Sequence, residues 1–234
     1  MQDTHDKTAE YLICDGIELA IERPLMSDGD IRAIQTGRWE PNESALAKAA
    51  LKPGDRVLEA GACLGYVSMV MARLVGPENV FAYEANPAPI DTARRNFARN
   101  GLNVEITNAI LVNRQRYEGA GQSVTFYVSN AVVSSSSIGK QGRSIAVPAV
   151  CLEDEIARRR CNVLMLDIEG GEADLLCDAD LRSIDKIIME THYRKAGRSE
   201  IDGMIRALYV KGFAIDLSLA RGEVIYMDRG TGSI

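Results

Sequence analysis

Short apolar runs and segments with helical spacing follow one another through the first half of the chain. Apolar runs predict strands over 56–59, 80–83 and 104–107. A helix is expected over 66–74, and a second runs from Asn86-Pro87 to Gly101, where apolar residues recur at helical spacing. Strands that alternate with helices in this way indicate βαβ units and a parallel sheet.

The second half continues the alternation and then changes its pattern. Residues 163–166 are apolar throughout, as in a strand buried on both faces, and 186–190 predict a further strand. A helix over 199–211 ends at Gly212. The tail then alternates from Phe213, turns, and ends in an all-apolar run, which predicts a β-hairpin. The second strand of this hairpin is expected to lie antiparallel in the sheet, buried between two neighbours.

Two regions stand outside this alternation. Residues 1–40 are expected to form an extension with short strand pieces such as 11–14, followed by a helix that Asn42 caps. About fifty residues separate the third and fourth strands, an unusual length for a connection. This 110–150 insertion contains strand patterns at 123–129 and 144–149, and a helix follows at 152–160. Its serine run, Ser134 to Ser137, and Tyr127 either line a ligand pocket or form a turn.

Composition narrows the class of protein. The chain has 234 residues, of which 46% are hydrophobic, enough to fill the core of one α/β domain. A net charge of −6 without a basic stripe argues against nucleic acid as a partner. The polar start and the lack of a run of ~18 apolar residues predict a cytoplasmic protein without membrane contact. Five scattered cysteines without a Cys-x-x-Cys pair argue against a disulfide framework or structural zinc.

The loop after the first strand carries the first chemical signal. In RVLEAGACLGY (56–66) the spacing is Gly61-x-x-x-Gly65, and Cys63 stands where a dinucleotide fingerprint needs its second glycine. Glu59 places a carboxylate near this loop, which is unfavourable beside a pyrophosphate but favourable beside an ammonium and a sulfonium. The loop therefore fits S-adenosylmethionine (SAM) better than NAD.

Further polar residues follow the other strands. Glu84 ends the second strand nineteen residues after Gly65, where a carboxylate can accept both ribose hydroxyls, although NAD enzymes share this feature. Asn108 ends the third strand and either meets the adenine edge or serves a turn. The stretch Asp167 to Glu172 follows the apolar fourth strand with three carboxylates and two glycines. At the carboxyl edge of a parallel sheet these residues face a common ligand site.

Four segments together resemble one family, the FkbM-type SAM-dependent methyltransferases. They are GDRVLEAGACLGY (54–66), VFAYEANP (80–87), VPAVCLEDEI (147–156) and LMLDIEGGEADLL (164–176), and the resemblance covers roughly 40–230. Residues 39–43 also resemble the family's aromatic–Glu motif. Met165 replaces a family lysine and Gly171 an alanine, while Glu59 and Cys63-Leu64 depart from the more common Asp and Gly-Ala-Asn loop.

The resemblance implies a Rossmann-like, class I methyltransferase fold with a mostly parallel seven-stranded sheet, in a domain over 41–234. It also implies a bacterial enzyme that O-methylates sugars or secondary metabolites and releases S-adenosylhomocysteine (SAH). Asp167 is carried over to the active-site edge. The motifs assign cofactor binding to nine residues: Glu59, Gly61, Ala62, Gly65, Tyr66, Glu84, Ala85, Asn108 and Ala109.

Methylation of a hydroxyl also needs a group that accepts a proton. Asp167 and His192 are the candidate catalytic residues, although His192 also suits a structural role after the fifth strand. The other histidine, His5, lies in the polar N-terminus and is not expected to take part. Asp167 with Glu169, Glu190 and His192 has ligand types that suit a divalent metal, but a metal-free site is the favoured prediction. The acceptor and the oligomeric state are not readable from the sequence.

Two other classes of function stay open at this point. An NAD(P)-dependent reductase would need a Tyr-x-x-x-Lys pair or its equivalent, and none of the lysines lies four residues after a tyrosine. The other class is a catalytically silent SAM-binding or scaffold protein, against which Asp167 and the intact glycine loop count weakly. A nucleic-acid amino-methyltransferase would want an Asn-Pro-Pro-Tyr type motif after the fourth strand, and Asn86-Pro87 follows the second strand instead.

Overall fold

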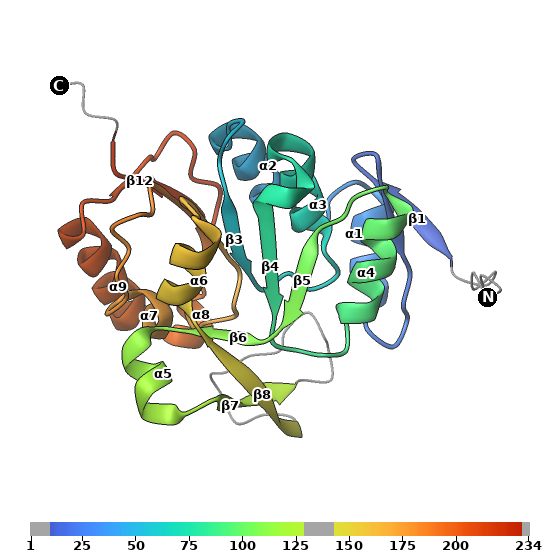
Figure 1. The fold of residues 1–234 in the computed structure, drawn as a ribbon. Helices are drawn as coiled ribbons and strands as arrows, with labels where there is room; N and C mark the ends of the chain where they lie inside the picture. The colour runs from blue at the N-terminus through green and yellow to red at the C-terminus, as the bar shows by residue number, and fades with distance from the viewer. Residues whose placement is uncertain (1–9, 129–142, 231–234) are drawn as a thin grey trace.

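A seven-stranded sheet forms the centre of the described part of the chain. The computed structural model describes residues 10–128 and 143–230, so the predicted serine run at 134–137 and His5 lie outside the described residues. The strand order is β11-β12-β10-β9-β3-β4-β5 (Figure 1). The bounds are Val57–Ala60 for β3, Val80–Glu84 for β4, Glu105–Asn108 for β5, Val163–Leu166 for β9, Lys186–Glu190 for β10, Ala214–Ile215 for β11 and Val224–Asp228 for β12.

The pairing of these strands confirms the predicted α/β class. Strand β3 is parallel to β4 and β9, and β5 and β10 continue the parallel arrangement at either side. Strand β12 is antiparallel to both β10 and β11 and lies between them, as the hairpin pattern predicts. The sheet is therefore mostly parallel, with an antiparallel strand from the C-terminal hairpin.

Alternate residues of each central strand enter different cores. In β3, Val57 packs with helices α2 to α4, whereas Leu58 packs with helices of the opposite face. The first face is covered by α2 (Pro41–Ala50), α3 (Tyr66–Val75) and α4 (Ile90–Arg99), and the second by α6 (Leu152–Arg159), α7 (Glu172–Leu176) and α9 (Arg198–Val210). Two short helices, η1 (Pro77–Asn79) and α8 (Tyr193–Ala196), lie in connections. Burial on both faces explains why these strands are continuously apolar.

The N-terminal extension packs on the first face. Strand β1 (Tyr11–Cys14) has the predicted bounds, but β2 (Ile17–Ala20) and α1 (Asp28–Gln35) were not predicted. The Asn96 side chain joins this segment to the glycine loop: its oxygen accepts from the Ala20 amide at 2.9 Å and its amide donates to the Leu64 carbonyl at 2.9 Å. The boundary between 40 and 41 stays a prediction.

Two predicted helix starts are wrong. Helix α2 begins at Pro41 after Glu40 rather than after an Asn42 cap, because Pro41 supplies the fixed φ of a first helical residue. Helix α4 begins at Ile90, not at Asn86-Pro87. The Asn86 side chain instead accepts from the Ala88 amide at 3.1 Å, and such a local bond holds the chain in a turn.

The insertion forms a second, smaller sheet. Strands β6 (Ile110–Val112), β8 (Arg143–Cys151) and β7 (Ser123–Val128) pair in that order, and α5 (Arg114–Ala120) connects β6 to β7. The sequence predicts β7 and β8 but neither β6 nor α5, since a three-residue strand carries almost no pattern. In Figure 1 this sheet lies below the main sheet.

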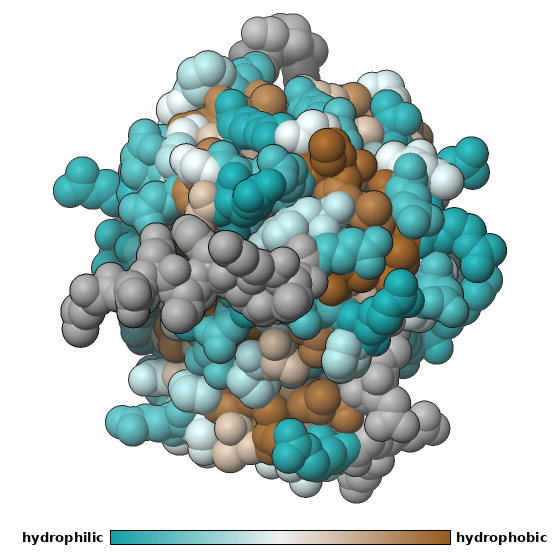
Figure 2. Space-filling model, turned by 90° about the vertical axis from the view of Figure 1, so that its right-hand side faces the viewer, coloured by the Kyte–Doolittle hydropathy of each residue, from teal (hydrophilic) through white to brown (hydrophobic). Residues whose placement is uncertain are grey.

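Hydrophilic residues dominate the surface seen in Figure 2, which shows the side of α1 and α4, and hydrophobic residues gather right of the centre and near the bottom of this view. Within 10–128 and 143–230, none of the helices is both long and apolar enough to cross a membrane. All five cysteines are free thiols, as their spacing predicts.

Candidate functional site

An open cavity of about 850 Å³, counted with the solvent space at its mouth, lies at the carboxyl edge of the main sheet. Five predicted site residues line it: Gly61, Glu84, Ala85, Ala109 and Asp167. They follow β3, β4, β5 and β9, because parallel strands bring the loops at their carboxyl ends to one edge. Chain segments about a hundred residues apart thus share one hollow.

Both glycines of the first loop are required by close packing. Gly61 has φ +90°, and a Cβ there would lie 1.8 Å from the carbonyl oxygen of Asp167. Gly65 has φ +79°, and a Cβ there would lie 2.3 Å from the Phe97 ring. The glycines therefore let the loop lie directly against β9 and α4, whether or not a ligand is present. Ala62 lines a smaller neighbouring cavity rather than the main one.

Glu84 is fixed by the backbone around it. One carboxylate oxygen accepts from the Cys63 amide at 2.9 Å, and the other accepts from the Asn86 amide at 2.7 Å. Burial raises the pKa of Glu84, and these backbone bonds oppose that shift. Each oxygen keeps a further lone pair, so the carboxylate can accept two more hydrogen bonds from a ligand in the cavity.

Two predicted cofactor residues use their side chains elsewhere. The Asn108 amide donates to the carbonyls of Glu84 at 2.8 Å and Ala85 at 3.1 Å, so it supports the loop after β4. The Tyr66 hydroxyl accepts from the Cys14 thiol at 3.5 Å, toward the N-terminal hairpin. A contact of either residue with a cofactor stays a prediction.

Glu59 lies behind the main cavity. It is buried, accepts from the Ser68 hydroxyl, and lines the smaller cavity together with Glu40, Glu43 and Asp167. Burial raises the pKa of Glu59 to about 7; the Ser68 hydrogen bond lowers it and Glu84 raises it further. This arrangement gathers four carboxylates around one small cavity.

Glu40 was not predicted as a site residue, although it lines both cavities. Its backbone has φ 41° and ψ 54°, a left-handed conformation that is uncommon for a residue other than glycine. Burial, and then the charge of Asp167, raise the pKa of the Glu40 carboxyl well above its usual range. The only sequence signal was the aromatic–Glu segment at 39–43, to which no role was attached.

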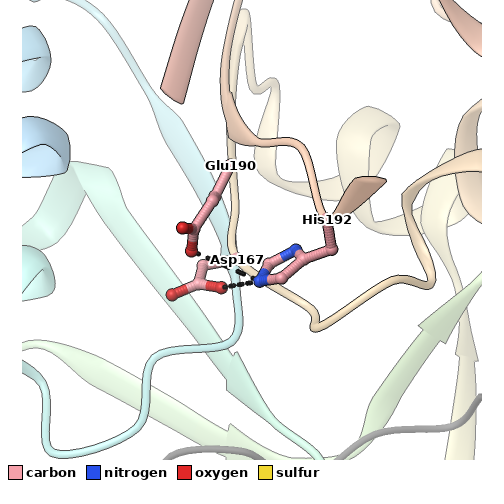
Figure 3. A group of neighbouring side chains, drawn as sticks. All are labelled: Asp167, Glu190 and His192. Atoms are coloured by element: carbon pink, nitrogen blue, oxygen red, sulfur yellow. Dashed lines mark ion pairs between the residues drawn. The ribbon is translucent and has the colours of Figure 1, made fainter. Parts of the chain in front are cut away.

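Asp167 and His192 lie close together, with Glu190 beside them (Figure 3). Nε2 of His192 lies 3.6 Å from Oδ1 of Asp167, 3.3 Å from Oε2 of Glu190 and 3.2 Å from Oε2 of Glu169. Its other ring nitrogen, Nδ1, lies 2.8 Å from Oε1 of the fully buried Glu172. The structure thus brings together both predicted catalytic residues and the four residues of the open metal alternative.

The charges of this cluster are strongly coupled. Burial lowers the pKa of His192, but hydrogen bonds with Glu169, Glu172 and Glu190 outweigh it and raise the pKa to about 12. The ring is then protonated at neutral pH and is poorly suited to accept another proton. Burial, followed by the charge of Glu190, raises the pKa of Asp167 well above its usual range.

The insertion also supplies residues that line the cavity. Phe126 of β7 and Arg116 of α5 line the cavity, and the Arg116 guanidinium pairs with Asp174 at 3.3 Å. Phe126 is buried, whereas Tyr127, for which the sequence leaves a pocket or a turn open, is not among the residues that line the cavity. Adjacent residues of a strand point to opposite faces, so Phe126 and its neighbour Tyr127 cannot both face the cavity.

The family is decided by a model match over most of the described chain. The model of the methyltransferase FkbM domain matches residues 59–215. The chain belongs to the FkbM methyltransferase family. This membership makes it a SAM-dependent methyltransferase and removes the NAD(P) reductase alternative. The motifs that carried the sequence resemblance at 54–66, 80–87 and 164–176 fall wholly or largely inside the matched segment.

Individual relatives of this FkbM-family chain are distant or match only locally. A protein-L-isoaspartate O-methyltransferase of Methylorubrum extorquens (strain PA1) is 47% identical over 57 residues, which span 24% of either chain. A SAM-dependent O-methyltransferase from Thermotoga maritima is 15% identical, with a TM-score of 0.47 over 97% of this chain and 79% of that one. A precorrin-6y C5,15-methyltransferase from Geobacter metallireducens GS-15 is 15% identical, with a TM-score of 0.44 over 89% and 91%. Similarities at this level carry no inference about the acceptor.

Proposed function

We propose that this methyltransferase transfers the methyl group of SAM to a hydroxyl oxygen of a small molecule. In the balanced reaction, the methyl–sulfur bond breaks with its electron pair left on sulfur, and a carbon–oxygen bond forms. The hydroxyl proton is released, so the products are a methyl ether, SAH and one proton.

One observation supports this proposal above the others. A single cavity is lined by the loop after β3, by Glu84, by Asp167, and by Phe126 and Arg116 of the insertion. A donor and an acceptor that occupy the two sides would meet at Asp167, between the glycine loop and the insertion. Holding two reactants in line supplies much of the rate enhancement of a displacement, about 7–11 kcal/mol in well-oriented cases.

The donor side suits a nucleoside with a cationic amino-acid chain. Glu84 has lone pairs for two ribose hydroxyls, and the backbone holds it in place. Glu40 and Asp167 are partly buried carboxylates that both line the cavity, where a positive charge would relieve their mutual repulsion. When bound, SAM supplies an electrophilic methyl group on a sulfonium. The residues present therefore fit the cofactor that the family uses.

Asp167 is better placed than His192 to accept the hydroxyl proton. Asp167 lines the cavity, and its Oδ1 is buried without a hydrogen-bond partner in the described chain. His192 has a carboxylate near each ring nitrogen, which keeps the imidazole protonated. We infer that Asp167 acts as the base and that His192 positions it.

The charge of the site limits the acceptor. Carboxylates outnumber cations among the charged residues that line the cavity, and Arg116 is already paired with Asp174. A polyanion such as nucleic acid would be repelled, and the net charge of −6 adds to that repulsion. We therefore expect a neutral or cationic small molecule, bound between Asp167 and the apolar Phe126.

The test follows the labelled methyl group. Purified protein is incubated with SAM that carries a tritiated methyl group, together with a panel of sugars, phenols and polyketide alcohols. We expect a labelled methyl ether and equimolar SAH, and a fall of roughly 10²–10⁴-fold in turnover for Asp167→Asn. SAM affinity, measured in parallel by calorimetry, separates a catalytic loss from a binding loss.

Two results contradict the proposal. Label found on nitrogen, on carbon or on a macromolecule would show that the protein methylates another group than the hydroxyl of a small molecule. Tight SAM binding by a folded protein that methylates nothing in the panel, with no loss on Asp167→Asn, would support a silent SAM-binding protein.

A further inference from the structure

We propose that Asp167, Glu190 and His192 bind a divalent cation at the acceptor side of the cavity. One ligand atom from each residue lies within 4.8 Å of those of the other two. Asp167 follows β9, Glu190 ends β10, and His192 comes two residues later, so adjacent parallel strands deliver all three (Figure 3). Cation binding stands independently of the proposed function, whereas its catalytic role rests on that function.

The spacing of the ligand atoms suits a first coordination shell. Nε2 of His192 is 3.6 Å from Oδ1 of Asp167 and 3.3 Å from Oε2 of Glu190. Adjacent ligands of an octahedral ion at ~2.1 Å lie about 3 Å apart, so both distances to Nε2 exceed that spacing by less than about 1 Å. The ligand atoms of Asp167 and Glu190 lie within 4.8 Å of each other.

His192 is oriented as metal-bound histidines are. Nδ1 lies 2.8 Å from Oε1 of Glu172, and this oxygen also accepts from the Gly170 amide at 3.2 Å. Glu172 is fully buried, so a turn of the ring would cost its carboxylate the 2.8 Å contact with Nδ1. A carboxylate on Nδ1 holds the proton of that nitrogen, so an ion that binds Nε2 would displace only the proton on Nε2.

A second observation points to a missing cation. Oδ1 of Asp167 is buried and has no hydrogen-bond partner within the described residues. Its distance of 3.6 Å from Nε2 of His192 is too long for a hydrogen bond. A buried carboxylate oxygen in this state is costly, and a bound cation would satisfy it. The neighbouring Glu169 is paired with Lys195 and is not needed as a ligand.

Two carboxylates and one imidazole suit a first-row divalent ion such as Mn²⁺. Three protein ligands leave up to three positions of a six-coordinate ion for water or the acceptor. Because Asp167 lines the cavity, these positions would face the acceptor hydroxyl. The cation would stabilise negative charge on that oxygen while the carbon–oxygen bond forms, and the hydroxyl proton would still leave by way of Asp167 to solvent.

The competing explanation is that the cluster neutralises itself. A protonated His192 would then be the cation shared by Asp167, Glu169 and Glu190, and no ion would bind. The two explanations differ in whether the purified chain takes up one ion.

The experiment titrates Mn²⁺ into chelator-treated full-length protein and follows free Mn²⁺ by electron paramagnetic resonance. We expect one tight site per chain, weakened at least about tenfold in Asp167→Asn, Glu190→Gln and His192→Gln. The matched control is Asp91→Asn, an exposed acid of α4 paired with Arg94, which should bind Mn²⁺ as the wild type does. Circular dichroism and SAM titration check that each variant folds.

Glu190→Gln is the decisive variant, since this side chain is 29% exposed and its amide is nearly isosteric with the carboxylate. Absence of a site in the wild type, or equal binding by wild type and Glu190→Gln, overturns the proposal. Full methyl transfer after exhaustive chelation would also remove the cation's catalytic role while the proposed function stands. Mn²⁺ binding without methyl transfer to any acceptor would support the cation site and contradict the proposed function.

Discussion

A Cβ atom on Gly61 would lie 1.8 Å from the carbonyl oxygen of Asp167. The glycine loop of the donor side therefore touches the backbone of the residue that we assign to the acceptor side. This contact couples the two halves of the cavity, because neither loop can move toward the other and a separation would widen the site.

Gly61→Ala is expected to destabilise the protein and to abolish SAM binding. The new methyl group must push β3 and β9 apart, in addition to the strain of φ +90°. The matched control is Gly54→Ala, where φ is +95° but a Cβ meets nothing within 4 Å. Urea unfolding should show that Gly61→Ala loses about 1–3 kcal/mol more unfolding free energy than Gly54→Ala. Equal losses of unfolding free energy in the two variants would mean that the close approach of Gly61 to Asp167 does not affect stability.

Glu84→Gln should weaken nucleoside binding by about 5–150-fold, since the amide places a donor where the carboxylate accepts a backbone N–H. Adenosine lacks the amino-acid chain, so its affinity should fall by the same factor as that of SAM if Glu84 binds the ribose. Calorimetry measures both, with Glu78→Gln as an exposed control. A loss confined to SAM would place Glu84 near the amino-acid chain instead.

Glu40→Gln should reduce the preference for SAM over SAH. SAM carries a positive sulfonium and SAH a neutral sulfur, so removal of a buried negative charge affects SAM more. Glu43→Gln is the matched control, because Glu43 lines only the smaller cavity. The ratio of the two dissociation constants is the readout. An unchanged ratio in Glu40→Gln would show that this carboxylate does not face the sulfonium.

Glu59 should make the free protein less stable as pH rises. Its pKa is about 7 in the folded state against the ordinary 4.5, so the folded state holds the proton more tightly. The contribution of Glu59 to the free energy of unfolding is fully present below about pH 4.5. It falls as the pH rises through 7 and then levels off, and the total loss is on the order of 3 kcal/mol. The difference in unfolding free energy between wild type and Glu59→Gln should follow this curve. A difference that is constant between pH 4 and 8 would contradict it.

The central strands were predictable because burial on both faces leaves a continuous apolar run. Residues 163–166 and 186–190 have the predicted bounds, and β12 lies between two strands as its apolar pattern indicates. Strand β6 and helix α5 were missed, because their short segments depend on pairing with β8 rather than on their own periodicity.

The candidate site was predictable only where a motif marks it. Gly61, Glu84 and Asp167 stand at strand ends and were found. Glu40 comes from a turn before a helix, and its place beside Asp167 depends on the packing of α2 on the sheet. The contact of Glu172 with His192 joins residues twenty positions apart and is set by the side-chain geometry of two loops.

Calorimetric titration of the wild-type protein with SAM and with NAD⁺ tests the central claim most directly. The acid-lined cavity predicts one SAM site per chain, weakened in Glu84→Gln, and no measurable heat with NAD⁺. Binding of NAD⁺ without binding of SAM would contradict the account.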